Sequence, residues 1–394
     1  MSESKNTTAM PKDFGFGEGE ELLRDMARKL LRDEIPIERL RQLVAPDPDK
    51  TYTRGERPDW DEALWKQCIE LGWTGLAVPE ELGGVGLSLV GIAGLVEEVG
   101  RAAFPSPLLS TLAASFVLTE AGTPEANTLL ERIAGGASVS LAITDETGSW
   151  EAATCEVEHS ASTEGGSTLS GRAYYVQDAF KADAFLVLSK GSDGHRLSIV
   201  ESGQAGLEIA QDHIHDLTRD QATLSFGEVV VEASAEVSLN AAAVVSRAWS
   251  AILVIVSADL VGTSEWQLQT TTEYARTRKQ FDRPIGFFQA VKHPLSNGMV
   301  KVDRARSLVY HAACCVDHGS VDACEAARMA KSAASDAGRF LSDRSVQLHG
   351  GIGFTWECDV HIYFKRSMHN QSLYGDGFYQ RSKLAERMIG PIGV

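Results

Sequence analysis

Residues 274–299 read YARTRKQFDRPIGFFQAVKHPLSNGM, and the rest of the chain can be organised around this stretch. A polar helical run breaks at Pro284 and Gly286, and apolar residues then recur at helical spacing. The pattern predicts the end of one helix, a turn and the start of another. Several cations lie near the turn, namely Arg276, Arg278, Lys279 and Arg283. Guanidinium groups bind phosphate oxygens bidentately, so the turn suits a diphosphate, and a solvated helix end is the alternative interpretation.

The spacing Y-x-x-x-R-x-Q-F-x-x-P-I-x-x-F-Q-A-V within this stretch resembles the signature of the acyl-CoA dehydrogenase family of flavoproteins. The resemblance implies that Arg278 holds the pyrophosphate of an FAD bound by a neighbouring subunit. It implies further cofactor contacts from Gln280, Phe281 and Gln289. The family's glycine after Gln-Phe is Asp282 here, which places a negative charge near the phosphate site.

A second motif, QLHGGIGFT, occupies residues 347–355. Its glycines allow close backbone approach, and the loop can equally serve as a helix C-cap. It resembles the family's Q-x-H-G-G-x-G-F/Y motif, which contacts FAD across a subunit interface. The resemblance implies cofactor contacts from Gln347, His349, Gly350 and Gly351. Shared cofactor sites imply at least a dimer, and the family is commonly tetrameric, so we expect a homo-oligomer or a hetero-oligomer arranged as a dimer of dimers.

Residues 141–149, LAITDETGS, resemble a degenerate form of the family's T-E-P-x-x-G-S-D loop, which lines the flavin and the thioester. Hydroxyls and backbone groups of such a loop can bond the polar edge of a flavin, which supports Thr144, Gly148 and Ser149 as contacts. The family's proline is absent, and Trp150 replaces the final Asp.

Residues 171–179, GRAYYVQDA, resemble the family strand G-x-K-x-W-I-T-N-A, which normally places a Trp against the isoalloxazine ring and a Thr near N5. Tyr175 stands at the Trp position, Val176 follows it, and Gln177 stands at the Thr position. Aromatic stacking can survive the first change, whereas the second alters flavin hydrogen bonding. A strand with Tyr and Val facing the core is the alternative.

The pattern along the 394 residues is helical, then strand-like, then helical again. Turn signals and short alternating runs between Ser138 and about Val237 predict a β-barrel or sandwich, which makes the protein α+β. This order is that of the acyl-CoA dehydrogenase fold, with an N-terminal helical domain, a middle β-barrel domain and a C-terminal four-helix bundle. The predicted parts are a flexible N-terminus (1–15), an N-terminal all-α domain (16–136), a middle β domain (137–238) and a C-terminal helical domain (239–394).

The formal net charge of −17 argues against nucleic-acid or anionic-membrane partners, which require a basic face. We find no apolar run that approaches a membrane span and no signal-peptide core, so we expect a cytoplasmic protein. The six cysteines and ten histidines lack metal-ligand spacing, and no metal site is predicted.

The usual catalytic base is absent. Dehydrogenation of an acyl-CoA needs a carboxylate to remove the α-proton while the β-hydride passes to the flavin. The family's Y-E-G-T motif corresponds to LYGDGFYQR at residues 373–381, which places Gly375 at the Glu position. Asp376 is one residue away and is the first candidate base, with a turn residue as the alternative.

Other family members carry the base on the helix that leads to Arg278, where the matching position is Ile252. Asp259 lies on roughly the same helix face two turns along, about 10 Å away by helix rise. It is the second candidate base, with a packing or solvent role as the alternative.

The leading functional hypothesis is FAD-dependent α,β-dehydrogenation of an acyl-CoA thioester, with electrons passed to an electron-transfer flavoprotein. The first alternative is a non-catalytic subunit that completes the FAD site of an active paralogue in a mixed tetramer. The tail LYGDGFYQRSKLAERM is similar to tails of actinobacterial dehydrogenases of steroid side-chain breakdown, some of which pair an active with a degenerate subunit. This similarity suggests lipid or steroid catabolism. The second alternative is a flavin-dependent oxidase of the same fold, in which an Asp acts as base.

Overall fold

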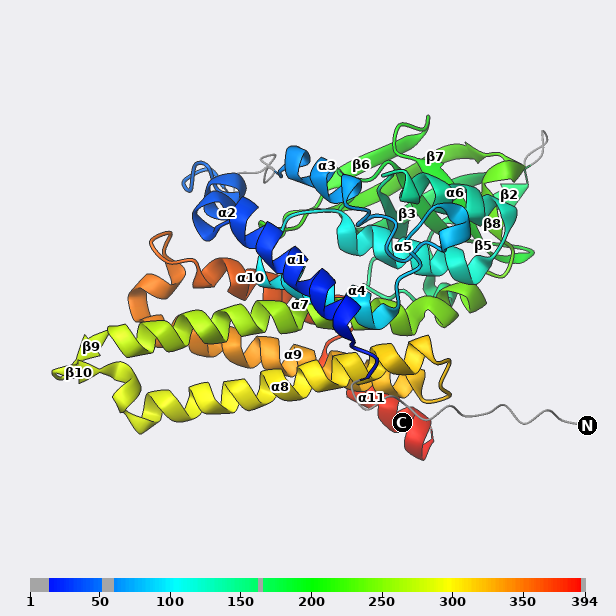
Figure 1. The fold of residues 1–394 in the computed structure, drawn as a ribbon. Coiled ribbons are helices and arrows are strands. Elements are labelled where there is room, and N and C mark those ends of the chain that lie inside the picture. The colour runs from blue at the N-terminus through cyan, green and yellow to red at the C-terminus, as the bar shows by residue number, and fades with distance from the viewer. Residues whose placement is uncertain (1–13, 52–59, 162–165, 391–394) are drawn as a thin grey trace, which may run out of the picture.

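The computed structural model describes residues 14–51, 60–161 and 166–390, and Figure 1 shows their arrangement. Most of the predicted flexible N-terminus, 1–15, lies outside these residues. The N-terminal part is helical, as expected. Its helices are α1 (Glu18–Glu34), α2 (Ile37–Val44), α3 (Glu62–Glu70), α4 (Leu89–Arg101), α5 (Leu108–Ala121) and α6 (Pro124–Ala134).

The middle part is a single sheet with the strand order β6-β7-β3-β2-β4-β5-β8, and β1 pairs in parallel with β4. The strands are β1 (Val139–Ala142), β2 (Glu158–Ala161), β3 (Ser167–Gln177), β4 (Ala184–Gly191), β5 (Gly194–Glu201), β6 (Leu207–Gln211), β7 (Gln221–Val231) and β8 (Glu236–Ser238). Within the described chain, β6 and β8 each pair with one neighbour, so hydrogen bonds do not close the sheet. The middle β domain expected from the sequence is therefore present as a sheet whose hydrogen-bonded path has two ends.

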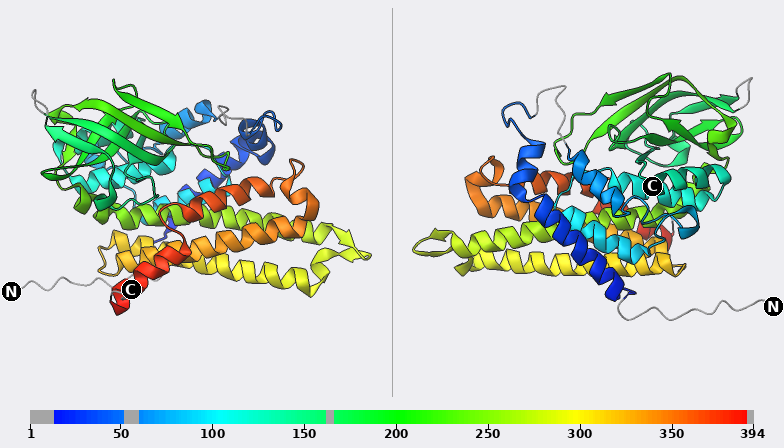
Figure 2. Two further views of the ribbon diagram at one scale, coloured as in Figure 1. Left: turned by 180° about the vertical axis from the view of Figure 1, so that it is seen from behind. Right: turned by 45° about the horizontal axis from the view of Figure 1, so that its top comes forward.

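The C-terminal part is a bundle of long helices below the sheet (Figures 1 and 2). Its elements are α7 (Ala241–Thr277), β9 (Lys279–Gln280), β10 (Arg283–Pro284), α8 (Gln289–Asp317), α9 (Ala323–His349), α10 (Val360–Ser372) and α11 (Gly377–Ile389). Helices α7, α8, α9 and α10 pack together, and α11 lies against α9. The β9–β10 hairpin forms the tip of the bundle at the end away from the sheet in every view.

Helix α7 is the centre of the hydrophobic core. Its most apolar 18-residue window has a mean hydropathy of 1.8, and in the described chain it is the one helix long and apolar enough to cross a membrane. The expectation that no run approaches such a length is thus corrected. Of this window, 72% is buried inside the protein, because α7 contacts α4, α5, α8, α9 and α10. This burial is typical of a core helix.

Helices α4 and α7 cross at two glycines that no larger residue could replace. A Cβ atom on Gly262 would lie 1.8 Å from the carbonyl oxygen of Glu97, and one on Gly100 would lie 2.2 Å from that of Asp259. A side chain at either position would push the helices apart. The close crossing therefore brings the charged residues of the two helices into one buried layer.

Candidate cofactor and substrate site

The tip between α7 and α8, residues 278–288, is called the arm. Its β9–β10 pair has Gln280 opposite Arg283, which leaves Phe281 and Asp282 as a two-residue loop. Both loop residues have positive φ, 52° and 60°, as a type I′ turn requires. Asp tolerates this left-handed conformation better than most residues, which explains how it can replace the family's glycine at position 282.

The arm exposes both its cations and its aromatic rings. Arg278, Lys279 and Gln280 are exposed, and the Phe281 side chain is 84% exposed. Among the described residues, the Arg278 guanidinium forms no ion pair, whereas Arg276 lies 3.9 Å from Glu273. An acidic protein that presents unpaired cations beside an exposed ring offers a surface suited to an anionic, ring-bearing ligand.

The two C-terminal motifs lie together at this end of the bundle. The His349 ring stacks on Tyr274, with centroids 4.2 Å apart, and His349 Nδ1 lies 2.7 Å from the carbonyl oxygen of Ser345. Burial lowers the pKa of His349, so the neutral ring donates from Nδ1. Gly350 has a φ of 68°, and a Cβ at Gly350 or Gly351 would meet open space. Backbone at these glycines is thus open to close approach by a ligand.

The loop after β1 is organised by Asp145. This buried carboxylate accepts hydrogen bonds from Thr147 Oγ1 and Ser149 N, both at 2.8 Å. Burial alone would raise the pKa of Asp145, but these hydrogen bonds outweigh it and hold the pKa below its ordinary value. Thr144 and Gly148 then line a cavity of about 180 Å³ at the end of β3.

The end of β3 bends at a bulge between Ala173 and Val176, where Tyr175 adopts a φ of 56° and stays 40% exposed. Gln177 is buried beside it, and its side chain is fully engaged. Its Nε2 donates to Gln221 Oε1 (2.8 Å), and its Oε1 lies 2.7 Å from His369 Nε2. Burial lowers the pKa of His369 to about 4, so the neutral ring donates to Gln177. Gln177, at the family's Thr position, therefore directs its side-chain hydrogen bonds to other residues of the protein.

The adjoining space, where an acyl group would lie, is almost closed. The cavity lined by Gln177, Ile252 and Tyr374 measures about 20 Å³, which is room for about one water molecule. An aromatic cluster lies beside it: Trp150 stacks on Trp249 (5.3 Å between centroids), and Tyr374 meets Trp249 edge-on at 5.0 Å. Trp150 and Trp249 also line a separate cavity of about 340 Å³. Trp150, which replaces the family's Asp, thus occupies space between the loop, α7 and the α10–α11 turn.

Neither predicted base lines these two cavities. Asp376 is the N-cap of α11, and its carboxylate accepts from Tyr379 N at 2.8 Å. This position agrees with the alternative interpretation of Asp376 as a turn residue. Gly375, at the family's Glu position, has a φ of 88°.

Asp259 is fully buried in a network of charges. Its carboxylate accepts from Arg366 Nη2 (2.6 Å), Arg219 Nη2 (3.1 Å) and Asn370 Nδ2 (2.6 Å). Burial alone would raise the pKa of Asp259, but the two arginines outweigh it and hold the pKa below its ordinary value. Its three hydrogen-bond donors stabilise its unprotonated form, and Asp259 lines neither of the two cavities described above, an arrangement that fits the alternative interpretation of Asp259 as a packing residue.

The structure places a different carboxylate at the small cavity. Asp178 is buried and accepts from Ser110 Oγ at 2.6 Å. Burial raises the pKa of Asp178. Sequence reasoning missed it, although its place at the Asn of the family's W-I-T-N motif was a usable signal. Arg219 and His369, which share the site, lie in no such motif and are brought in by long-range packing.

The arm and the cavity at the end of β3 do not meet within one chain. The arm lies at the tip of the bundle, and the sheet lies toward the other end (Figures 1 and 2). The predicted contacts thus form two half-sites: Thr144, Gly148, Ser149, Tyr175, Val176 and Gln177 at one, and Arg278, Gln280, Phe281, Gln289, Gln347, His349, Gly350 and Gly351 at the other. A site composed of both halves needs a second subunit.

Comparisons with known proteins match both helical parts of the chain. The family model "Acyl-CoA dehydrogenase, N-terminal domain" matches residues 17–137, and "Acyl-CoA dehydrogenase, C-terminal domain" matches residues 248–389. Acyl-CoA dehydrogenase IpdE2 of Mycobacterium tuberculosis is 31% identical over 356 residues, which are 89% of this chain and 91% of that protein.

Two similar solved structures carry paired names, and one of them is described as a complex. The chain resembles the ChsE4-ChsE5 complex of Mycobacterium tuberculosis with a TM-score of 0.84 and 27% identity, over 96% of this chain and 100% of that one. It resembles a variant of the steroid acyl-CoA dehydrogenase Tcur3481-Tcur3483 with a TM-score of 0.82 and 28% identity, over 94% and 98% of the two chains.

Proposed function

This chain belongs to the acyl-CoA dehydrogenase family, and we propose that it is a subunit of an FAD-dependent acyl-CoA dehydrogenase whose paralogous partner carries the catalytic carboxylate. The proposal rests on the substrate region, which lacks the catalytic residue and has little free volume. Gly375 replaces the catalytic Glu, and of the two cavities that its neighbour Tyr374 lines, the one that reaches Ile252 and Asp178 measures only about 20 Å³. Such a space does not admit a thioester.

The residues of the arm fit the cofactor that the fold implies, which is FAD. Arg278 offers an unpaired guanidinium within the described chain, and the open glycines 350 and 351 allow a diphosphate to approach the backbone. When bound, FAD supplies the acceptor for the β-hydride of the substrate. The role of this chain is to bind and orient the diphosphate through Arg278, Gln280, Phe281, Gln289, Gln347, His349, Gly350 and Gly351.

The half-site at the end of β3 fits a flavin less well. Thr144, Gly148, Ser149 and the exposed Tyr175 ring suit its polar edge and its face, and Val176 continues the strand beside them. Gln177, however, is held by Gln221 and His369, and the 180 Å³ cavity is smaller than ordinary ligand pockets of about 300–1,000 Å³. We therefore propose that the flavin used in catalysis lies against the sheet of the partner subunit and contacts the arm of this chain.

The partner and substrate are proposed from the comparisons. Similar structures are the ChsE4-ChsE5 complex and a steroid acyl-CoA dehydrogenase named for two chains. We accordingly propose a hetero-oligomer acting on the CoA thioester of a steroid-derived or other lipid acid, with an electron-transfer flavoprotein as electron acceptor.

The test compares this chain alone with the chain co-expressed with a Glu-bearing family member. We expect the complex to retain FAD and to bleach on anaerobic mixing with a steroid-side-chain acyl-CoA, whereas the chain alone does not bleach. Arg278→Ala in this chain should lower the FAD content of the complex, and the matched control Arg276→Ala should leave it unchanged. A chain that retains FAD alone and bleaches with an acyl-CoA would refute the proposal.

One observation favours a second candidate, a self-sufficient dehydrogenase. Asp178 lines the small cavity, and its raised pKa favours proton uptake. If the chain alone bleaches with an acyl-CoA and Asp178→Asn abolishes bleaching without loss of FAD, this second function is the correct one.

A further inference from the structure

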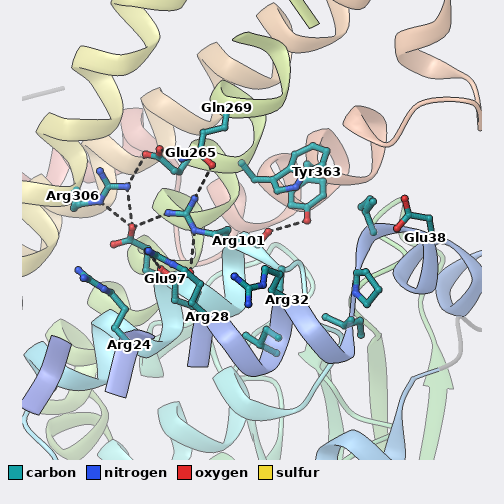
Figure 3. Close-up of a pocket in the computed structure, with 17 residues that line it drawn as sticks. Arg24, Arg28, Arg32, Glu38, Glu97, Arg101, Glu265, Gln269, Arg306 and Tyr363 are labelled. Atoms are coloured by element: carbon teal, nitrogen blue, oxygen red, sulfur yellow. Dashed lines mark hydrogen bonds and ion pairs between the residues drawn. The ribbon is translucent and has the colours of Figure 1, made fainter. Parts of the chain in front are cut away.

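A further large cavity lies apart from both half-sites. It measures about 740 Å³ and opens between α1, α4, α7, α8 and α10 (Figure 3). None of its lining residues belongs to the motifs of the arm or to the cavities at the end of β3. Its volume falls within the range of about 300–1,000 Å³ that small-molecule sites occupy.

The floor of this cavity is a layer of compensated charges. Arg306 bridges Glu97 and Glu265, with Nε 3.0 Å from Glu97 Oε1 and Nη2 2.8 Å from Glu265 Oε2. Arg101 donates to Glu98 at 3.1 Å, and Arg28 holds Glu98 through two bonds of 3.0 and 2.7 Å. The buried carboxylates are thus already neutralised, so they do not repel an incoming anion.

One wall is a flat aromatic surface. The rings of Trp266 and Tyr363 stack with centroids 3.6 Å apart and planes 5° from parallel, and both residues line the cavity. Tyr363 is anchored by its hydroxyl, which donates to the carbonyl oxygen of Arg101 at 2.9 Å. The other lining residues include the apolar Leu31, Ile35, Pro36 and Ile37 at the end of α1 and the start of α2. Flat aromatic and aliphatic surfaces of this kind suit a planar ring system.

A row of arginines borders the cavity along α1. Arg24, Arg28 and Arg32 are spaced by four residues, so they lie on one face about 6 Å apart. Figure 3 shows all three on the α1 side, with Glu265, Gln269 and Tyr363 coming from across the cavity. Arg32 is 69% exposed and lies 3.0 Å from its neighbour Asp33. Arg24 Nη2 lies 3.5 Å from Glu21 and 3.6 Å from Asp25, whereas Arg24 Nε is buried without a hydrogen-bond partner among the described residues. An extended row of guanidiniums fits a diphosphate better than a single carboxylate.

We propose that this cavity binds a nucleotide-like ligand, in which a flat base lies against Trp266 and a diphosphate lies along Arg24, Arg28 and Arg32, with Arg28 shared between the diphosphate and Glu98. The lining itself holds five arginines and four glutamates, a formal excess of one positive charge in a chain of net charge −17. The ligand is either a free nucleotide or the adenosine diphosphate part of a coenzyme A compound. The site is separate from the proposed arm site and does not depend on the chain being a dehydrogenase subunit.

The experiment is isothermal titration of the purified chain, and of its FAD-loaded complex where one forms, with adenosine diphosphate, adenosine, pyrophosphate and coenzyme A. We expect adenosine diphosphate to bind once per copy of this chain, with adenosine and pyrophosphate at least tenfold weaker. Trp266→Leu should weaken binding by roughly 5- to 100-fold, which corresponds to the loss of one stacked base. Arg32→Ala should weaken it by roughly three- to tenfold and leaves folding intact, because its side chain is exposed.

Two controls separate this site from the cofactor site. Lys29→Ala removes a neighbouring cation of α1 that does not line the cavity, and Arg278→Ala removes the proposed FAD contact. Neither should change the affinity for adenosine diphosphate. Tighter binding of coenzyme A, with the same losses in Arg32→Ala and Trp266→Leu, would support the coenzyme source, and weaker binding would support a free nucleotide. The proposal is overturned if adenosine diphosphate does not bind, if it binds equally to Arg32→Ala and Trp266→Leu, or if pyrophosphate binds as tightly.

Discussion

Replacing Asp259 by Asn distinguishes a structural carboxylate from a catalytic one. The change keeps the size of the side chain and removes its charge from a site with no exposed surface. Arg366, also fully buried, would lose its charged partner at 2.6 Å, and Arg219 would lose its own at 3.1 Å. Two guanidiniums would then remain buried without full compensation.

The size of the effect follows from the burial. Removal of one partner of a buried ion pair costs about 3–5 kcal/mol, and a folded domain is stable by only about 5–15 kcal/mol. We therefore expect Asp259→Asn to lower the free energy of unfolding by about 3–5 kcal/mol. The matched control is Asp336→Asn, because Asp336 pairs with Arg381 at 2.9 Å and is half exposed. Exposed pairs contribute about 1 kcal/mol or less, so this control should behave almost as the wild type.

The assay is urea unfolding followed by tryptophan fluorescence at fixed protein concentration. Asp259 also makes stability depend on pH, because its folded pKa lies below its ordinary value of 3.8. The stabilisation from this shift is complete well above pH 4 and is lost as the pH falls below 3.8, and Asp259→Asn should remove that part of the acid dependence. If the free energy of unfolding of the variant lies within about 0.5 kcal/mol of the wild type, which is the usual range of surface substitutions, the network is not structural and the reasoning fails.

Two further predictions concern the turn that replaces the catalytic motif. Lys331 is buried and donates to the carbonyl oxygens of Gln371 (2.9 Å) and Gly375 (3.0 Å), and burial lowers its pKa to about 7. Because the unfolded chain keeps this proton up to about pH 10, stability should rise between pH 7 and 10, and urea midpoints of Lys331→Met should lack that rise. Gly375→Glu should not restore a base, because its Cβ would lie 2.3 Å from Tyr379 Cδ1 at a φ of 88°. We expect thermal unfolding to show a free energy of unfolding lower by about 1–3 kcal/mol, and we expect no flavin bleaching. The control Gly319→Glu should lose less stability, because φ is positive there but nothing lies within 4 Å of its Cβ.

The sequence alone predicted the order of helices, sheet and helices, because periodicity and turn residues are local signals that survive without tertiary contacts. The family's spacing around Arg278 and the QLHGG motif also lie in continuous stretches, and so does the replacement of the catalytic Glu by Gly375. Sequence reasoning alone could not choose between a charge run on a helix end and a ligand-binding arm.

Only the tertiary structure decided what the buried polar residues do. Asp259 is 107 positions from Arg366, and Gln177 is 192 positions from His369, so their pairing depends on how α7, α10 and β3 pack. The stacking of Trp150 on Trp249 likewise depends on how the loop after β1 packs against α7. Long-range contacts of this kind leave no periodic pattern in the sequence. Each residue fits its own helix or strand equally well whether its side chain acts in catalysis, forms an ion pair or packs in the core.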